Sequence, residues 1–328
     1  MTSLTSAPML FVELLADRSQ KPSALLLDFR AGQAEAFLPL VAHPDFLALT
    51  SRFTCLFLST DTLAPDALRD AGCRPMNAET LHRTASPVDK ALPPAAQWVA
   101  GDWYFAPPAK PSGNQAVSRA LALQLVQLVC ADADTHEIEA VLRRDPALSY
   151  HLLRLVNSLG MGLGKRITSF SQAILILGRA QLRRWLNLML FSSREGDVRS
   201  AMLLARVAVR ARTMELLAKS GGIDKSGQEL AFMAGMFSLL GILFGLPLVE
   251  VLKPLKVSDA LLAAVLTHEG ELGRLLQLVE SAERRDAAAL SALLDAAQLP
   301  HAEFNLLTIQ AYGWMLDVVR NSREGANG

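Results

Sequence analysis

Residues 145–187 read DPALSYHLLRLVNSLGMGLGKRITSFSQAILILGRAQLRRWLN, and this stretch decides the fold of the segment around it. Asp145 and Pro146 predict a helix start, because the carboxylate can accept hydrogen bonds from first-turn N–H groups and proline at the first helical position gives up none. Apolar residues recur at helical spacing from Leu148 until Asn157 and Ser158 open a glycine-containing end signal. The stretch therefore begins with a short amphipathic helix.

Two more helices follow within the same stretch. Thr168 or Ser169 can cap the first of them, because a hydroxyl oxygen satisfies free N–H groups at a helix start. Its apolar side includes Ala173 and ends at Gly178. Residues 181–191 then place Leu182, Trp185 and other apolar residues along one side of a further helix.

The runs LLRLVNS, ITSFSQAILILG and LRRWLNLML resemble the HDOD domain, a bacterial output module related to the HD hydrolases. The later runs RARTMELLA, AFMAGMFSLL and AVLTHEGELGRLLQLVESAERRD resemble the HDOD version that follows EAL domains in the YuxH-like family. The resemblance covers roughly residues 116–286. It implies a structural or interaction role for the motif positions Asp145, Pro146, Leu148, Asn157, Ser158, Ile167, Ser169, Ala173 and Gly178.

Residues 1–110 differ from the rest, because short apolar runs alternate there with helical or turn-like segments. The runs are Met9 to Leu15, Ala24 to Phe29 and Cys55 to Ser59, which is an α/β pattern. A helix between the second and third runs should break at Pro44. Prolines and a glycine between residues 107 and 113 predict a linker, so we place one domain at 1–110 and a second at 111–328.

GDWYFAPP, residues 101–108, resembles the tail of an EAL domain, and that resemblance implies a (β/α) barrel that hydrolyses cyclic di-GMP. A barrel of eight such units needs about 200 residues, but the predicted linker leaves only about 110 residues for this domain. The EAL family carries a Glu-Ala-Leu or Glu-Leu-Leu signature that supplies a metal-binding glutamate. Glu13-Leu14-Leu15 matches this signature but lies near the N-terminus, without the metal-binding carboxylates expected downstream. The expected fold class is therefore α+β: a small α/β domain that is a truncated, catalytically dead EAL-barrel remnant, followed by an all-α HDOD domain.

Helices should fill most of the second domain. We expect them to start at Thr135, near Asp197, near Ser226, at Ser258, near Glu271, near Asp286 and after Pro300. The run from Ala231 to Val249 is uncharged, but glycines and a proline interrupt it, so we interpret it as a buried core helix that ends near Gly245 rather than a membrane span.

Composition limits the function classes. Lys plus Arg and Asp plus Glu number 32 each, so the whole chain has no electrostatic preference for nucleic acid or membrane. The three cysteines are scattered and odd in number, and the N-terminus has no basic segment leading into an apolar core, which favours a cytoplasmic location.

The sequence contains no local pattern of metal-binding residues. The sequence has no His-Asp dipeptide, and no two of its six histidines lie three to five residues apart, so no single helix can supply a histidine pair. The resemblance agrees, because HDOD domains lack the HD metal ligands. We therefore expect no catalytic residues, no metal, no cofactor and no enzyme activity.

An arginine-rich stretch is the remaining chemical signal. Between Arg143 and Arg212 there are thirteen basic residues and only three acidic ones. Arginine suits planar recognition of carboxylate or phosphate. We favour internal pairing with acidic residues of the C-terminal third and keep open a basic binding face formed by Lys165, Arg166, Arg179, Arg183 and Arg184. The acidic candidates are Glu250, Asp259, Glu269, Glu271, Glu280 and Glu283.

Two functions follow as hypotheses. The resemblance implies a non-enzymatic bacterial regulator that acts through protein–protein contacts of its HDOD domain, in motility, biofilm, stress or virulence control, with an unidentified signalling partner, a weaker expectation of a homodimer, and no membrane. The alternative is a regulator that binds a nucleotide such as cyclic di-GMP, or nucleic acid, through the arginine-rich face. A residual phosphodiesterase is a third and more distant hypothesis.

Overall fold

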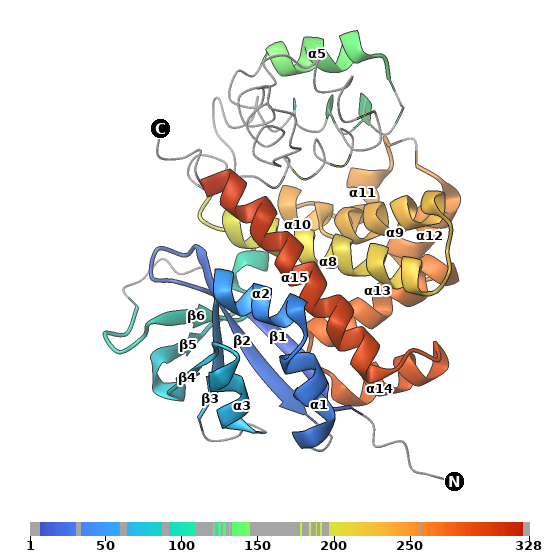
Figure 1. The fold of residues 1–328 in the computed structure, drawn as a ribbon. Coiled ribbons are helices and arrows are strands. Elements are labelled where there is room, and N and C mark those ends of the chain that lie inside the picture. The colour runs from blue at the N-terminus through green and yellow to red at the C-terminus, as the bar shows by residue number, and fades with distance from the viewer. Residues whose placement is uncertain are drawn as a thin grey trace, which may run out of the picture.

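The computed structural model describes residues 7–30, 34–59, 64–86, 92–108, 133–144, 197–255 and 257–323, together with single positions between 121 and 191 (Figure 1). A six-stranded sheet from the N-terminal third lies against a group of helices from the C-terminal half. The C-terminal helix runs along both, so it is part of the boundary between them.

The sheet contains one antiparallel strand among parallel ones. Its strands are β1 (Met9–Ala16), β2 (Pro22–Arg30), β3 (Thr54–Leu58), β4 (Arg74–Met76), β5 (Leu81–Arg83) and β6 (Trp98–Ala100), in the order β4-β3-β2-β1-β6-β5. β1 runs antiparallel to both of its neighbours, and the other pairs are parallel. The β1–β2 hairpin turns at Asp17, whose carboxylate accepts from the backbone N–H groups of Ser19 and Lys21.

The sheet must be curved. β4 and β5 are its two edges, yet only residues 77–80 connect them. A flat six-stranded sheet is about 24 Å wide between its edge strands, whereas five residue steps reach at most about 18 Å. The short connection, which includes the 3₁₀ turn η1 (Ala78–Thr80), therefore keeps the sheet bent into a half-barrel.

Three short helices cover the outside of the half-barrel: α1 (Ala34–Val41), α2 (Pro44–Arg52) and α3 (Pro65–Asp70). α1 and α2 separate at Pro44, as predicted, and the ring Nδ1 of His43 accepts from the backbone N–H of Asp45 to cap α2. A second 3₁₀ turn, η2 (Trp103–Phe105), follows β6 and buries Trp103 and Tyr104. These elements lead the chain into the helical part.

The described helices of the rest of the chain are α5 (Thr135–Arg143), α8 (Ser200–Ser220), α9 (Lys225–Phe237), α10 (Leu240–Phe244), α11 (Leu248–Leu252), α12 (Asp259–Thr267), α13 (Gly270–Glu283), α14 (Ala287–Ala296) and α15 (His301–Arg323). Ser258 and Asp286 cap α12 and α14, as predicted, by accepting from backbone N–H groups three residues later. Gly245 closes α10 with a positive φ of 62°. By length and composition α9 and α10 together could cross a membrane, but 61% of that stretch is buried inside the protein.

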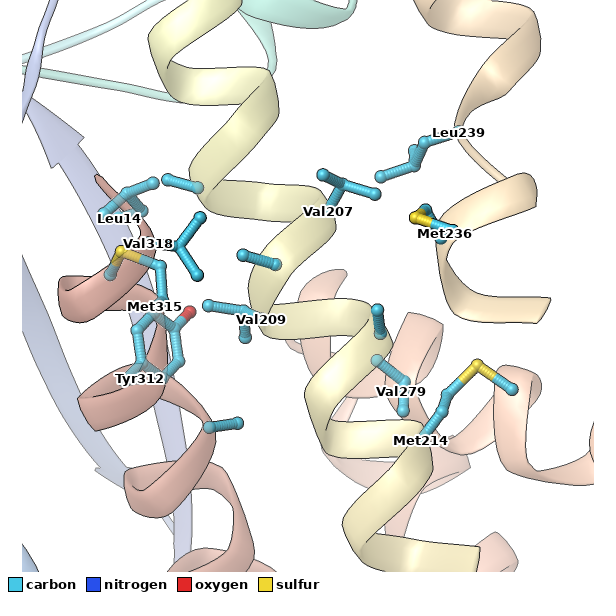
Figure 2. Close-up of a cluster of buried hydrophobic side chains, with 14 of the residues drawn as sticks. Leu14, Val207, Val209, Met214, Met236, Leu239, Val279, Tyr312, Met315 and Val318 are labelled. Carbon is cyan, nitrogen blue, oxygen red and sulfur yellow. The ribbon is translucent and has the colours of Figure 1, made fainter. Parts of the chain in front are cut away.

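α8 is the central helix, with 16 of its 21 residues buried. It contacts α9, α13 and α15 as well as β1, β2 and η2. Figure 2 shows this core: Leu14 of β1 and Tyr312, Met315 and Val318 of α15 lie on one side of α8, and Met236, Leu239 and Val279 lie on the other. Sheet and helices thus share one hydrophobic core.

α15 also completes the hydrogen bonding of β1. β6 pairs with β1 only at Ala16, so the first half of β1 has no strand on that side. There the buried Asn305 side chain accepts from the backbone N–H of Leu10 at 2.9 Å and donates to the backbone oxygen of Pro8 at 2.7 Å. The Tyr312 hydroxyl donates to the backbone oxygen of Val12. A helix from the far end of the chain therefore replaces a missing strand.

The predicted fold class is wrong. We expected a small α/β EAL-barrel remnant followed by a self-contained all-α domain, but the N-terminal part is a mixed six-stranded half-barrel whose core includes α8 and α15. The prediction missed β4, β5 and β6, which have three residues each and are too short for a periodic pattern. It also treated the last helix as a member of the helical domain alone, because local sequence does not show which distant surface an amphipathic helix covers.

Gly235 in α9 provides a test of the packing between α8 and α9. A Cβ at Gly235 would lie 2.8 Å from the Cα of Ala211 in α8, whereas a Cβ at Gly313 in α15 would meet nothing within 4 Å. We expect Gly235→Ala to lower the unfolding free energy by about 1–3 kcal/mol through overpacking. Gly313→Ala, the matched control, should raise it by up to about 1 kcal/mol because alanine favours a helix. Urea denaturation of both variants measures the difference, and equal effects would contradict the close helix crossing.

Candidate functional site

Five of the described arginines of the basic stretch form ion pairs within the protein: Arg184, Arg199, Arg206, Arg210 and Arg212. Arg184 is 6% exposed and contacts the carboxylates of Glu215 and Glu229 at 2.7 Å each. Its guanidinium also lies 4.0 Å from the centre of the Phe232 ring. Arg184 is therefore not available as part of an exposed basic face.

Arg206 and Arg210 project from α8 toward the C-terminal end of α13, where Glu283 lies between them. Arg210 binds Glu283 through two nitrogens and also donates to Ser238 Oγ at 2.8 Å. Arg206 donates to the Tyr104 hydroxyl at 3.0 Å and lies 3.8 Å from Glu283. This cluster, Arg206, Arg210, Glu283 and Tyr104, is called the buried clamp below, and it confirms the predicted pairing of the basic stretch with Glu280 and Glu283.

Electrostatics decide the protonation states within the buried clamp. Burial by itself would raise the pKa of Glu283, but the charges of Arg210 and Arg206 and the hydrogen bond from Arg210 outweigh it and lower that pKa below its ordinary value. Burial raises the pKa of the Tyr104 hydroxyl. Glu283 is thus ionised, and Tyr104 keeps its proton.

A second charged cluster occupies the carboxyl-terminal edge of the half-barrel. Glu13 of β1 is 12% exposed and accepts from both Nη atoms of Arg83 at 2.7 Å and from Arg285 at 2.8 Å. Arg83 ends β5, and Arg285 follows α13 in the chain. The sequence analysis treated Glu13 as an isolated residue near the N-terminus and missed both arginines, which lie 70 and 272 residues away from it.

Two further charges belong to this edge. Asp28 of β2 is opposite Phe11 in the β1–β2 register, on the same face of the sheet as Glu13, and it accepts from Nε of Arg30 at 2.8 Å. The diagonal position relative to Glu13 corresponds to about 7–8 Å between strands. We call the five residues Glu13, Asp28, Arg30, Arg83 and Arg285 the edge cluster.

The concave face of the half-barrel behind the edge cluster is apolar. Its side chains are Leu15, Ala24, Leu26, Leu56, Met76 and Ala100, with Leu58, Leu81 and Trp98 packed against them. Because ligands of open α/β sheets bind beyond the carboxyl ends of the strands, the edge cluster is the polar site that this sheet offers. Arg30, Arg83 and Arg285 have side chains exposed by 51%, 42% and 31%, so a ligand can reach them.

The described residues contain no group of three or more His, Cys, Asp or Glu side chains that could hold a metal ion. Cys55 and Cys73 are free and buried, as predicted, and burial raises the pKa of Cys73 to about 12.

Most of the predicted motif positions lie outside the described residues. These are Asp145, Pro146, Leu148, Asn157, Ser158, Ile167, Ser169 and Ala173, and with them the basic residues Lys165, Arg166, Arg179 and Arg183. Gly178 is described: it is exposed and has φ +75°, a conformation that favours glycine.

A comparison with known families identifies one domain in this chain. The family model of the HDOD domain matches residues 119–254, which include α5 and the helices α8 to α11. The chain contains an HDOD domain. That part of the sequence resemblance is confirmed, whereas the match does not show the EAL-like remnant expected for residues 1–110.

Two curated relatives support the HDOD domain. The chain is 34% identical over 167 residues to the cyclic di-GMP phosphodiesterase CdgJ of Vibrio cholerae, which covers 51% of this chain and 38% of that protein. It is 29% identical over 175 residues to the uncharacterised protein YuxH of Bacillus subtilis, which covers 53% of this chain and 42% of that protein. The chain thus spans about two fifths of the length of these HDOD relatives.

Two crystal structures from Shewanella amazonensis show a weak likeness. One is of a protein provisionally assigned as a phosphohydrolase, with TM-score 0.41, 16% identity and coverage of 62% of this chain and 93% of that one. The other is of a protein provisionally assigned as a metal-dependent phosphohydrolase, with TM-score 0.39, 15% identity and coverage of 64% and 92%. Likenesses of this size support no argument about the HDOD domain or its neighbours.

The similarity to CdgJ corrects two predictions. We expected a protein that is not an enzyme and that acts only through protein–protein contacts, but a relative with 34% identity is a cyclic di-GMP phosphodiesterase. The expectation rested on the missing His-Asp dipeptide and on histidine spacing. Those patterns test only metal sites built within one segment, and they say nothing about a site such as the edge cluster, which tertiary structure assembles from distant residues.

The buried clamp predicts a specific loss of stability in acid. The pKa of Glu283 is lower in the folded state than in the unfolded state. Ionised Glu283 therefore makes its full contribution to the free energy of unfolding above the unfolded-state pKa of about 4.3. That contribution disappears as the pH falls toward the folded-state pKa. Glu283→Gln should destabilise the protein by about 3–5 kcal/mol at pH 7, since it leaves buried arginine charge without a partner. The variant should also show a shallower decline in stability below pH 4.5 than the wild type.

Thermal or urea unfolding between pH 3 and 7 measures both effects. Glu250→Gln is the control, because Glu250 is exposed on α11. If the stability of Glu283→Gln depends on acid pH in the same way as that of the wild type, Glu283 is not the titrating group.

Proposed function

We propose that the protein acts on cyclic di-GMP, as a phosphodiesterase of cyclic di-GMP signalling. The observation that carries the proposal is the 34% identity to CdgJ over half of this chain. The HDOD domain at residues 119–254 of this chain is consistent with a role in bacterial signalling.

The edge cluster is the site that we assign to the dinucleotide. Arg30, Arg83 and Arg285 are partly exposed cations at the carboxyl-terminal edge of the sheet. Guanidinium groups bind phosphate oxygens through paired hydrogen bonds, and cyclic di-GMP carries two phosphates. The arrangement therefore offers more than one contact to a doubly charged ligand.

Ligand binding would change the state of the two carboxylates. In the absence of a ligand Glu13 accepts three hydrogen bonds from arginines and Asp28 accepts one. A phosphate that draws Arg83 or Arg285 away leaves Glu13 with free acceptor sites. In this proposal Glu13 orients a water molecule and accepts its proton as the water oxygen attacks a phosphorus atom, which is the role of a general base. The bond between that phosphorus and one sugar oxygen breaks, and the sugar oxygen takes a proton from solvent.

Any metal ion would have to bind at least partly through side chains outside the described residues, since the described part offers no such group. We also infer a reducing, cytoplasmic location from the two free thiols Cys55 and Cys73.

Incubation of the purified protein with cyclic di-GMP tests the proposal, with Mg²⁺ or Mn²⁺ added and the linear dinucleotide product measured by chromatography. Calorimetry gives the affinity. Arg285→Gly should weaken binding at least about tenfold, because a charged hydrogen bond contributes about 1.5–3 kcal/mol. Its fold should survive, since residue 285 has φ +56° and glycine adopts that conformation without strain.

Arg52→Gln is the matched control, because Arg52 also forms an ion pair between the two parts of the chain, with Asp317, but lies outside the edge cluster. The control should bind like the wild type. Absence of both binding and hydrolysis in the wild-type protein would overturn the proposed function.

A further inference from the structure

We infer that helix α8 of the HDOD part controls the edge cluster through the turn that follows α13. The inference rests on the proposed function for the ligand, but its structural part stands on separate observations. Residues 283–286 connect α13 to α14, and three of them face three different regions of the protein.

The first of these residues is fixed from α8. Glu283 binds Arg210 through two nitrogens and lies 3.8 Å from Arg206. Arg210 is in turn held by Ser238 at the end of α9. Because Glu283 is buried and ionised, it cannot leave this position without separating charges in a poorly solvated region.

The third residue of the turn, Arg285, reaches the edge cluster. Its Nη1 donates to Glu13 of β1 at 2.8 Å, although the two residues are 272 positions apart. Its backbone has φ +56°, which costs a non-glycine residue roughly 1–2 kcal/mol. Contacts on either side must therefore hold the turn in this conformation.

Asp286 completes the turn by capping α14 through the backbone N–H of Ala289. The turn is thus held at its first residue by α8, at its third by β1 and at its fourth by α14. A displacement of α8 moves Glu283 and, two residues later, the cation that the edge cluster offers to a phosphate. Arg210, Glu283 and Ser238 are accordingly positioning residues.

Ser238→Ala is the most selective perturbation, because it loosens Arg210 without leaving a buried charge unpaired. Ser238 accepts a hydrogen bond from Arg210, and in this proposal its loss reaches the edge cluster through Glu283 and the turn. We expect ligand-free hydrogen exchange at the backbone amides of Arg284, Arg285 and Asp286 to become about tenfold faster or more, in line with the loss of one hydrogen bond to a charged group. We expect the affinity for cyclic di-GMP to fall by a similar factor.

Two controls separate positioning from a general loss of stability. Asp317→Asn breaks the Arg52–Asp317 ion pair, which also joins α2 to α15 but does not touch the turn, so exchange at residues 284–286 should not change. Ser238→Thr keeps the hydroxyl oxygen and should restore slow exchange and affinity.

The outcomes distinguish the two proposals. Faster exchange in Ser238→Ala together with weaker ligand binding supports both. Faster exchange in a protein that does not bind cyclic di-GMP supports the coupling and overturns the ligand assignment. Unchanged exchange and unchanged affinity overturn the coupling, whether or not the wild type hydrolyses cyclic di-GMP.

Discussion

The rest of the structure depends on one buried ion cluster, in which Glu283 is held by Arg210 and approached by Arg206. Both arginines come from the central helix α8, so the cluster fixes the rotation of that helix relative to α13. Burying three charges costs solvation free energy that their mutual attraction only partly returns. Such a cluster is therefore better understood as a constraint that selects one arrangement of helices than as a source of net stability.

The same cluster reaches the sheet through Tyr104. This residue belongs to the 3₁₀ turn after β6, and its hydroxyl accepts from Arg206. Tyr312 and Asn305 of α15 also hydrogen-bond to the backbone of β1. The half-barrel is thus tied to the helices by polar contacts at two places, with the apolar core of Figure 2 between them. This arrangement explains why a short sheet with three-residue edge strands can persist.

The sequence was informative wherever the signal was local. Runs of apolar residues predicted β1, β2 and β3, and capping residues predicted the starts of α12 and α14, because these elements are specified by neighbours within a few positions. The preference for internal pairing holds for described arginines such as Arg206 and Arg210, which pair with Glu283, whereas most of the other basic residues of the stretch lie outside the described residues. Charge balance over a long segment is a property that sequence alone can show.

The failures have a common physical cause, which is sequence separation. Glu13 looked like a single carboxylate near the N-terminus, because Arg83 and Arg285 come to it only through the sheet order and the α13–α14 turn. The prediction of a protein without catalytic function rested on the absence of local ligand patterns and was wrong for the same reason. No periodicity or spacing rule reports contacts of this range.

The pairing of the arginines bears on where a ligand can bind. Arg184, Arg206 and Arg210 are buried and neutralised by carboxylates, so α8 and its neighbours present few free cations to a phosphate. In the edge cluster the opposite holds, because three partly exposed arginines share only two carboxylates. The edge cluster therefore has an excess of positive charge that a ligand can reach at the sheet edge. A dinucleotide that bound there would contact β1, β2, β5 and the turn after α13 at once, and so would be sensitive to the packing of α8 against the sheet.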